Sequence, residues 1–485
     1  MRPINRRDFL HDSAALAAAL AGARGLNGAL QGAEKEKAAK KVGANEQLQV
    51  AVIGVHGRGR DHVKGFAGQN GCVVATICDA DEAVAGPAIR SAEKAQGKAP
   101  KYQQDLRRVF EDKSIDVVTI ATPNHWHALA AIWAMQAGQD VYVEKPVSHN
   151  VSEGRRIVEI ARKYGRICQT GTQSRSNPGM REAMEFLHAG KLGHIKVSRG
   201  LCYKNRPSIG KVTGEQPIPK TVDYDLWCGP APKKPLLRKR LHYDWHWIWD
   251  YGNGDLGNQG IHEMDIARWG LGKHELCRAV QSVGGRFGYV DDGETANTQI
   301  CVFDYGDCEL IFEVRGLPTK DLLGAKVGNI FYGTEGYLVS PGYSGATAFD
   351  QKGKVIKTFG GGGNHYGNFV KAVHSRKAED LNADILEGHL SSALCHLGNI
   401  SYRLGGLQPF SKDSQAFGDD KEAYETLKRM EEHLKSNEIA LDQTSYHVGP
   451  KLRFDPNTES FIGDPDADVH LTRHYRAPFV VPDKA

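Results

Sequence analysis

The stretch Gln49-Val50-Ala51-Val52-Ile53-Gly54-Val55-His56-Gly57-Arg58-Gly59 decides the fold of this chain. Its apolar, largely β-branched start predicts a buried strand. The glycines permit a tight turn, and a helix-compatible stretch follows, whose free N–H groups and positive dipole end favour a phosphate. A second strand-like run over residues 72–78 ends at Asp79, 20 residues after Gly59, which is the interval at which a carboxylate binds the ribose hydroxyls. We therefore predict a Rossmann domain that binds a dinucleotide.

One position departs from the usual glycine pattern. His56 stands where the second glycine belongs, and we expect the neighbouring Gly57 to permit the close approach instead. Asp79 favours NAD over NADP, because a carboxylate repels a 2′-phosphate, although Arg58 and Arg60 weaken that preference. The predicted phosphate turn consists of Gly54, His56, Gly57, Arg58 and Gly59.

The alternation of strands and helices continues beyond this first unit. A buried strand is predicted over residues 115–121 and another over 140–143, with an alanine-rich helix between them that ends at Gly138. Ligands of such sheets bind outside the carboxyl ends of the strands. The residues expected to reach the cofactor from these ends are Thr122, Asn124, His127, Glu144 and Lys145.

Composition and charge narrow the class of protein. The 485 residues are 40% hydrophobic and 25% charged, with a formal net charge of +4, which indicates a globular chain of two or more domains. A charge this small, without a basic stripe interleaved with aromatic residues, argues against nucleic acid as a partner. No stretch is long and apolar enough to insert into a membrane.

The N-terminus reads as a targeting signal. Asn5-Arg6-Arg7-Asp8-Phe9-Leu10 precedes the alanine-rich run of residues 14–21, an order typical of twin-arginine export to the periplasm. The alternative is an ordinary amphipathic helix. We predict a signal peptide over residues 1–33 and a charged linker over 34–47. The Rossmann domain would span 48–170, a substrate and oligomerisation domain 171–405, and a C-terminal extension 406–485.

The cysteines do not indicate a disulfide framework. There are nine, without a C-x-x-C pair or metal-like spacing, and Cys78, Cys168 and Cys301 lie in strand-like runs. We predict buried free thiols.

Several motifs together resemble one family. Thr122-Pro123-Asn124-His125-Trp126-His127 and Glu144-Lys145-Pro146 are similar to segments of the glucose–fructose oxidoreductase, inositol dehydrogenase and MocA (Gfo/Idh/MocA) family. Further similar segments are Gly171-Thr172-Gln173, Trp227-Cys228-Gly229-Pro230, Gly257-Asn258-Gln259-Gly260-Ile261-His262 and Asn368-Phe369. The resemblance extends over residues 48–405 and is specific for the family but not for a substrate.

The resemblance implies an α/β protein in which the N-terminal Rossmann domain precedes a second α/β domain. That second domain is expected to have an open, largely antiparallel sheet, with strands over residues 298–303 and 309–314. A helix over 385–404 would return to the first domain. The resemblance also implies a homo-oligomer, either a dimer or a tetramer, and adds Gln173 to the cofactor-binding residues.

The resemblance assigns catalytic roles to Lys145 and His262. A lysine in this place stabilises alkoxide charge or relays a proton; the alternative is a surface lysine at a strand end. In many relatives a D-x-x-x-H pattern on one helix lets the aspartate orient the histidine. Here Asn258 occupies the aspartate position, so His262 lacks a charged partner unless Asp255, Glu263 or Asp265 supplies one. His262 could equally be structural.

The segment Tyr243-Asp244-Trp245-His246-Trp247-Ile248-Trp249 is rich in aromatic residues. Indole faces stack on sugar rings, so Trp245, His246 and Trp247, with Asp265, are predicted to bind substrate. The alternative is an aromatic packing cluster or an oligomer contact. No histidine motif typical of a metal site is present, and we predict no metal.

Three functions follow from these observations. The first is an NAD-dependent oxidoreductase acting on a hydroxyl of a sugar, polyol or glycoside. Because free NAD is scarce outside the cytoplasm, export favours a tightly bound cofactor. The second is a redox-neutral glycosidase, lyase or epimerase that oxidises C3 transiently. The third is a non-catalytic protein that holds NAD, a function favoured by Asn258.

Overall fold

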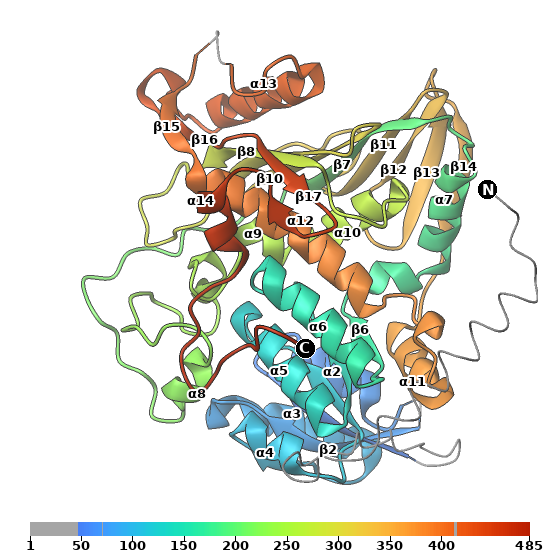
Figure 1. The fold of residues 1–485 in the computed structure, drawn as a ribbon, viewed down its shortest axis with the longest axis vertical. Coiled ribbons are helices and arrows are strands. Elements are labelled where there is room, and N and C mark those ends of the chain that lie inside the picture. The colour runs from blue at the N-terminus through green and yellow to red at the C-terminus, as the bar shows by residue number, and fades with distance from the viewer. Residues whose placement is uncertain (1–46, 70, 412–414) are drawn as a thin grey trace, which may run out of the picture. The chain divides into compact units, whose positions relative to one another are not determined.

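The structure is a computed structural model that describes residues 47–69, 71–411 and 415–485; the predicted export signal and most of the predicted linker lie outside them. Its first sheet is parallel throughout, in the order β3-β2-β1-β4-β5-β6 (Figure 1). The strands are β1 (Leu48–Ile53), β2 (Cys72–Cys78), β3 (Lys101–Gln103), β4 (Val117–Ile120), β5 (Asp140–Val143) and β6 (Cys168–Thr170). The helices between them are α2 (Gly59–Phe66), α3 (Ala85–Gln96), α4 (Leu106–Glu111), α5 (Asn124–Ala137) and α6 (Val151–Lys163). The strand order reverses between β1 and β4, which is where such a sheet opens a crevice for a ligand.

The second sheet is mixed and mostly antiparallel, since β7 and β10 form its one parallel pair among the described strands. Its order is β14-β13-β12-β11-β7-β10-β9-β8-β16-β15, with β17 paired to β8 and β18 to β17. The strands are β7 (Ile195–Cys202), β8 (Ala279–Gly285), β9 (Thr298–Asp304), β10 (Glu309–Arg315), β11 (Val327–Gly333), β12 (Gly336–Ser340), β13 (Gly345–Asp350), β14 (Val355–Gly360), β15 (Gly406–Pro409), β16 (Ser445–Val448), β17 (Leu452–Asp455) and β18 (Ser460–Phe461). The predicted fold class is confirmed.

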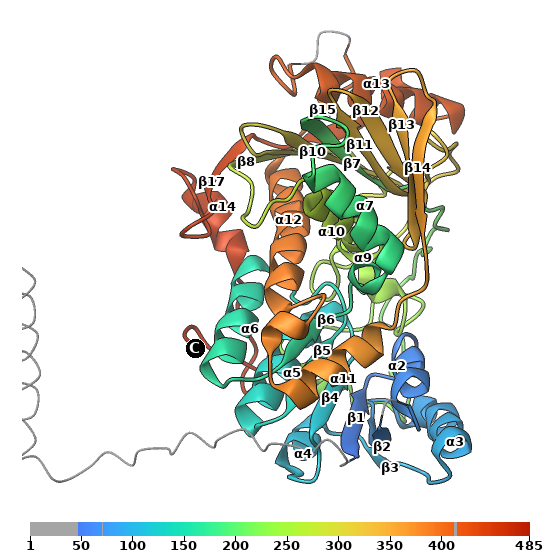
Figure 2. The same ribbon diagram turned by 90° about the vertical axis from the view of Figure 1, so that its right-hand side faces the viewer.

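Helices cover both faces of the second sheet (Figure 2). On the face toward the first sheet lie α7 (Pro178–His188), α9 (Gly254–Asn258), α10 (Gly260–Gly270) and α12 (Ile385–Leu404). α13 (Lys421–Ser436) lies on the opposite face and buries Ala423, Leu427 and Leu434 there. The remaining helices are α8 (Tyr224–Cys228), α11 (His365–Ser375) and α14 (Pro465–Asp468). The predicted helix over 385–404 is confirmed as α12, which packs against α6.

Residues 406–485 are part of both layers. They contribute β15, β16 and β17 to the second sheet, beside β8. The last residues then return to the first domain, where Phe479 packs edge-on against Trp126 of α5 at 5.4 Å. All nine cysteines lie in the described residues, buried and without a disulfide, as predicted. Among the described helices, none is long and apolar enough to span a membrane.

Residues 203–253, which we call the strap, connect β7 to α9 and cross onto the first domain. The N–H of Glu82 donates to the carbonyl of Thr221 at 3.0 Å, and the N–H of Asp223 donates to that of Ala80 at 2.9 Å. The indole N–H of Trp126 donates to the carbonyl of Leu226 in α8 at 2.8 Å. The strap therefore covers the crevice at the carboxyl ends of the parallel strands.

Candidate active site

The glycine turn after β1 is built as a dinucleotide requires. Gly54 has a positive φ of 83°, and a Cβ there would lie 2.7 Å from the carbonyl carbon of Ala121. A Cβ on Gly59 would lie 1.8 Å from the carbonyl oxygen of Gly54, whereas the space beside Gly57 is open to 4 Å. α2 begins without a side-chain cap, and since the N–H groups of Arg60 and Asp61 bond back to the carbonyls of Gly57 and Arg58, those of Gly57, Arg58 and Gly59 are left for an anionic ligand. His56 does not block this turn, because its exposed ring stacks on His242 at 4.5 Å.

Asp79 is fixed at the end of β2. Its carboxylate oxygens accept the N–H groups of Val55 at 2.7 Å and Asp81 at 3.0 Å. Burial raises the pKa of Asp79, while these two bonds oppose the shift. Each oxygen keeps a second lone pair for a ribose hydroxyl. Together with the turn, this geometry fits an adenosine dinucleotide.

These residues share one cavity of about 530 Å³, the main cavity. It reaches from Asp79 past the glycine turn to Lys145 and His262. Every residue predicted to bind cofactor or to act in catalysis lines the main cavity except Gly59, which lies beneath the turn. The lining residues among them are Gly54, His56, Gly57, Arg58, Asp79, Thr122, Asn124, His127, Glu144, Lys145, Gln173, Asn258 and His262. Their roles in binding and catalysis stay predictions.

The loop after β4 is tied to its surroundings. The ring nitrogens of His127 lie 2.6 Å from the carbonyl of Pro146 and 2.8 Å from that of Thr122, so this histidine joins the loops that follow β4 and β5. Asn124 donates its amide to Asn253 of the strap at 3.0 Å. The buried hydroxyl of Thr122 has no partner among the described residues. An unsatisfied hydroxyl at the cavity wall fits a polar ligand.

Glu144 is a buried anchor of the site. Its Oε1 accepts bonds from Arg58 at 3.0 Å, from Gln173 at 3.2 Å and lies 3.1 Å from the His62 ring. Burial opposes ionisation, but the bond with His62 and the charge of Arg58 prevail, and the pKa of Glu144 lies well below its usual range. A fixed anion therefore sits beside Lys145.

Lys145 points to the end of α9. Its Nζ donates to the backbone carbonyl of Asn258 at 2.8 Å. That carbonyl is available because the helix breaks at Gln259: the N–H of His262 bonds to Gln259 at 3.2 Å rather than four residues back. Burial lowers the pKa of Lys145, partly offset by Glu144. The ammonium is thus held in the cavity by one neutral acceptor.

His262 faces the same cavity. Its ring lies 5.0 Å from that of Tyr343, and no described residue forms a hydrogen bond with its nitrogens. Burial, and then the charge of Lys145, lower its pKa to about 3, so the imidazole is neutral with a free lone pair. Asn258 lies on α9 and His262 on α10, so the expectation that they share one helix is wrong. Asn258 contributes its carbonyl to Lys145 rather than its amide to His262.

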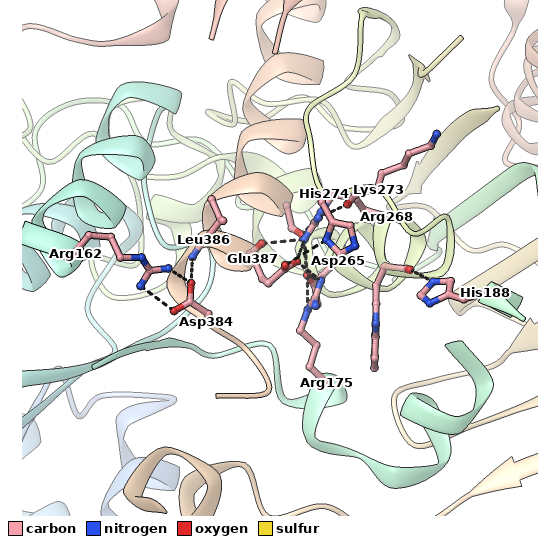
Figure 3. A network of polar contacts seen from close by, with 12 residues as sticks. Arg162, Arg175, His188, Asp265, Arg268, Lys273, His274, Asp384, Leu386 and Glu387 are labelled. Carbon is pink, nitrogen blue, oxygen red and sulfur yellow. Dashed lines mark hydrogen bonds and ion pairs between the residues drawn. The ribbon is translucent and has the colours of Figure 1, made fainter. Parts of the chain in front are cut away.

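The position of Asp265 differs from the predicted one. It was expected to bind substrate or to support His262, but it does not line the main cavity. Figure 3 shows it in a buried ion network, where Arg175 donates to it at 2.8 Å and Arg268 pairs with Glu387. The hydroxyl of Ser391 donates to it at 2.7 Å. A carboxylate saturated in this way stabilises the packing of α10 on α12.

The other two carboxylates near His262 are also engaged elsewhere. Asp255 pairs with Arg206 at 2.9 Å. Glu263 accepts the hydroxyl of Tyr343 at 2.6 Å, its second oxygen is buried without a partner among the described residues, and burial raises its pKa to about 8.

The aromatic segment divides between two roles. Trp245 and His246 stack at 3.7 Å and line the main cavity. Trp247 does not line it; it is buried against Tyr243 and the guanidinium of Arg206, so the structure does not place it beside the other predicted substrate-binding residues. The segment therefore forms part of the cavity wall and part of a packing cluster, and its binding of substrate stays a prediction.

Sequence reasoning missed several residues of the cavity wall. Tyr343 and the strap residues Leu226, Trp227, His242 and Tyr243 line it, as do Gln104 and Leu106. They come from loops distant in sequence, without a motif, so only the aromatic density of the strap could have indicated some of them. In the described part of the chain, no group of three or more His, Cys, Asp and Glu side chains is arranged to hold a metal ion.

Comparison with known proteins agrees with this geometry. A family model described as "Oxidoreductase family, NAD-binding Rossmann fold" matches residues 48–172, and one described as "Oxidoreductase family, C-terminal alpha/beta domain" matches residues 192–433. A levoglucosan dehydrogenase solved in complex with NADH and levoglucosan has the same fold, with a TM-score of 0.54 and 19% identity over 73% of this chain and 98% of that one.

Two curated relatives show the range of activities. A glycosyl hydrolase family 109 protein of Saccharopolyspora erythraea is 31% identical over 210 residues, 41% of this chain and 45% of that protein. An inositol 2-dehydrogenase of Salmonella typhimurium is 28% identical over 181 residues, 37% of this chain and 52% of that protein. The chain spans about half the length of these relatives. With an NAD-binding domain and the second domain both matched, this chain belongs to the Gfo/Idh/MocA family of oxidoreductase enzymes.

Proposed function

We propose that this enzyme oxidises or reduces a hydroxyl-bearing carbon of a sugar, polyol or glycoside with a retained NAD. The observation that carries the proposal is the position of Lys145, whose Nζ lies 2.8 Å from the Asn258 carbonyl in the cavity that also holds His262 and the glycine turn. The names of the matched relatives support a carbohydrate or polyol substrate.

The chain supplies charge and proton transfer. A nicotinamide bound in the main cavity would supply hydride chemistry at the carbon that bears the substrate hydroxyl. The ammonium of Lys145 stabilises negative charge on the hydroxyl oxygen. Neutral His262 has a lone pair for the hydroxyl proton, and since its pKa is about 3 it is a weak base that depends on Lys145 to acidify the hydroxyl. Trp245 and His246 offer flat faces for a sugar ring.

The strap supports retention of the cofactor. Leu226 and Trp227 line the main cavity, and the backbone bonds between Ala80 and Asp223 and between Glu82 and Thr221 hold the strap beside Asp79. A dinucleotide under this cover would leave only after the strap opens, which is the property that an exported NAD enzyme needs.

A second function is favoured by the similarity to a glycosyl hydrolase family 109 protein. Oxidation of a glycoside at C3 would acidify the proton at C2 and permit elimination of the C1 substituent. Addition of water and reduction at C3 by the same NADH would then complete a cycle without net redox change. This cycle requires a base and a cation beside the cofactor, and His262 and Lys145 would supply them as in the first function.

A panel of aryl glycosides distinguishes the two functions. Stoichiometric NADH would support the dehydrogenase, and release of the aglycone without net NADH would support the redox-neutral cycle. Lys145→Met should lower kcat by about 100-fold or more, by loss of a charge that stabilises the transition state, whereas the exposed Lys94→Met should not. A wild-type protein that retains NAD but performs neither reaction on any glycoside, sugar or polyol contradicts the proposal.

Mass spectrometry of the denatured wild-type protein measures retention of the cofactor separately. The protein should release one equivalent of NAD when it is denatured.

We also propose that Arg6 and Arg7 direct export to the periplasm by the twin-arginine route. The predicted homo-oligomer and the predicted domain boundaries stay predictions, which light scattering and limited proteolysis measure.

A further inference from the structure

A second cavity of about 270 Å³ lies away from the cofactor turn. Four segments enclose it: the residues just before α6, strap residues 249–253, the C-terminal part of α12, and residues 469–474 after α14. Figure 1 shows α14 beside α12, above α6. Its wall is rich in donors, including Arg403, Arg473 and His149. None of the functions discussed above uses it.

Two buried donors in this wall lack an acceptor. Nη1 of Arg473 donates to the carbonyl of Asp250 at 2.9 Å and lies 3.2 Å from Nδ1 of His149. A guanidinium carries only donors, so Nδ1 must hold the lone pair and Nε2 the proton. Both His149 Nε2 and Arg473 Nε are buried without a partner among the described residues. Buried donors of this kind indicate a missing acceptor, such as an ion or a ligand.

The positive charge of the arginines in the wall of the second cavity also indicates an anionic ligand. The guanidinium of Arg403 lies 5.2 Å from the centre of the Trp249 ring and forms no hydrogen bond with a described residue. Among the described lining residues, Asp250 is the one acid, and Lys234 already pairs with it at 2.6 Å. Two arginine charges thus face a cavity whose one lining carboxylate already pairs with Lys234; Glu294, which acts on Arg403 from outside the lining, accepts the N–H of Trp249 at 2.7 Å.

We propose that the second cavity binds a small oxyanion, a phosphate, sulfate or carboxylate group, between Arg403 and Arg473. Guanidinium groups bind such anions through paired, charge-assisted hydrogen bonds. Nε2 of His149 adds a neutral donor from the cavity wall. Because a water occupies about 30 Å³ in the liquid, the volume accommodates an oxyanion with several waters, or a small metabolite that carries one.

The second cavity is connected to the main cavity by a pair of amides. Asn253 lines the second cavity and donates to the carbonyl of His149 at 3.1 Å. Its Oδ1 accepts the amide of Asn124, which lines the main cavity, at 3.0 Å. The two cavities have no lining residue in common, so the oxyanion site is separate from the proposed reaction site and does not depend on which reaction occurs there.

Calorimetric titration of the purified full chain tests the proposal. Inorganic phosphate, sulfate and acetate are titrated at constant ionic strength, and the ion that binds most tightly identifies the oxyanion class. We expect one saturable site in the wild type. Arg403→Gln and Arg473→Gln should each raise Kd at least tenfold, because a hydrogen bond to a charged group contributes about 1.5–3 kcal/mol.

The matched control is Arg453→Gln, which removes the same charge from an exposed position of β17 outside the second cavity. It should bind like the wild type. Arg403 is exposed, so its variant tests the proposal even where Arg473→Gln fails to fold. Absence of saturable binding in the wild type overturns the proposal. Binding by Arg403→Gln that equals wild-type binding also overturns it. Tm is measured with and without the anion as a second readout, and an equal rise in Tm for the wild type and all variants would likewise overturn the proposal, because excluded anions stabilise any protein.

Discussion

At the scale of single residues, Glu263 gives the clearest consequence for pH. Burial raises its pKa to about 8 in the folded chain, above the usual value of 4.5. The folded state therefore binds the proton more tightly. The stability this contributes is complete below pH 4.5 and is lost as the pH rises toward 8. The loss amounts to a few kcal/mol, at about 1.4 kcal/mol per pKa unit.

We expect Glu263→Gln to remove this part of the pH dependence, because the amide stays neutral and still accepts the Tyr343 hydroxyl. Tm measured from pH 5 to pH 8 should fall less for Glu263→Gln than for the wild type. The exposed Glu335→Gln should keep the wild-type slope. A Glu263→Gln protein with the wild-type slope would show that the carboxyl is ionised throughout.

Residues carried by motifs were predictable, and those fixed by tertiary partners were not. Lys145 and Asp79 follow strands, and the sheet alone places them at the main cavity. Asp265 could not be assigned, because its partner Arg175 lies 90 residues away. The role of Glu263 was not predictable either. Its carboxyl accepts the hydroxyl of Tyr343, 80 residues away, instead of pairing with His262.

At the scale of elements, the strap is held by a contact that only glycine permits. Gly229 has a φ of 49°, and a Cβ there would lie 2.2 Å from the Trp126 ring. Gly229→Ala should weaken docking of the strap by about 1–3 kcal/mol, the usual cost of overpacking. Bound NAD should then dissociate roughly 10- to 100-fold faster, as followed by the NAD content of protein during dialysis.

Gly214→Ala is the matched control on the same strap, because nothing lies within 4 Å of the Cβ it would add. It should retain NAD like the wild type. If both variants lose NAD at the wild-type rate, the strap does not limit release of the cofactor.

Elements that are buried on nearly every side were predicted well from their runs of residues. The helix over 385–404 and the strands of residues 298–303 and 309–314 agree with α12, β9 and β10. The break between α9 and α10 was not predictable from the D-x-x-x-H spacing, since a spacing of four fits an unbroken helix. The strap has no periodicity, because it packs partly on itself and partly on the first domain rather than along one face of a regular element.

At the scale of the whole molecule, we expect the cofactor to bind before the predicted export of the chain. The strap closes the main cavity with residues from the second domain, so we expect NAD to bind before the domains complete their packing. The twin-arginine route carries folded proteins, which would let a loaded enzyme leave the cytoplasm. The residues concerned, Arg6 and Arg7, lie outside the described part of the chain.

Arg6→Lys combined with Arg7→Lys keeps the charge but removes the arginine pair, so the chain should stay in the cytoplasm with its NAD. Arg2→Lys, outside the pair, should be exported like the wild type. Cell fractionation with measurement of NAD in each fraction gives both results. Export of the paired variant at the wild-type level would contradict the signal. A periplasmic wild-type chain without NAD would contradict loading before export, because free NAD is too scarce there to supply it later.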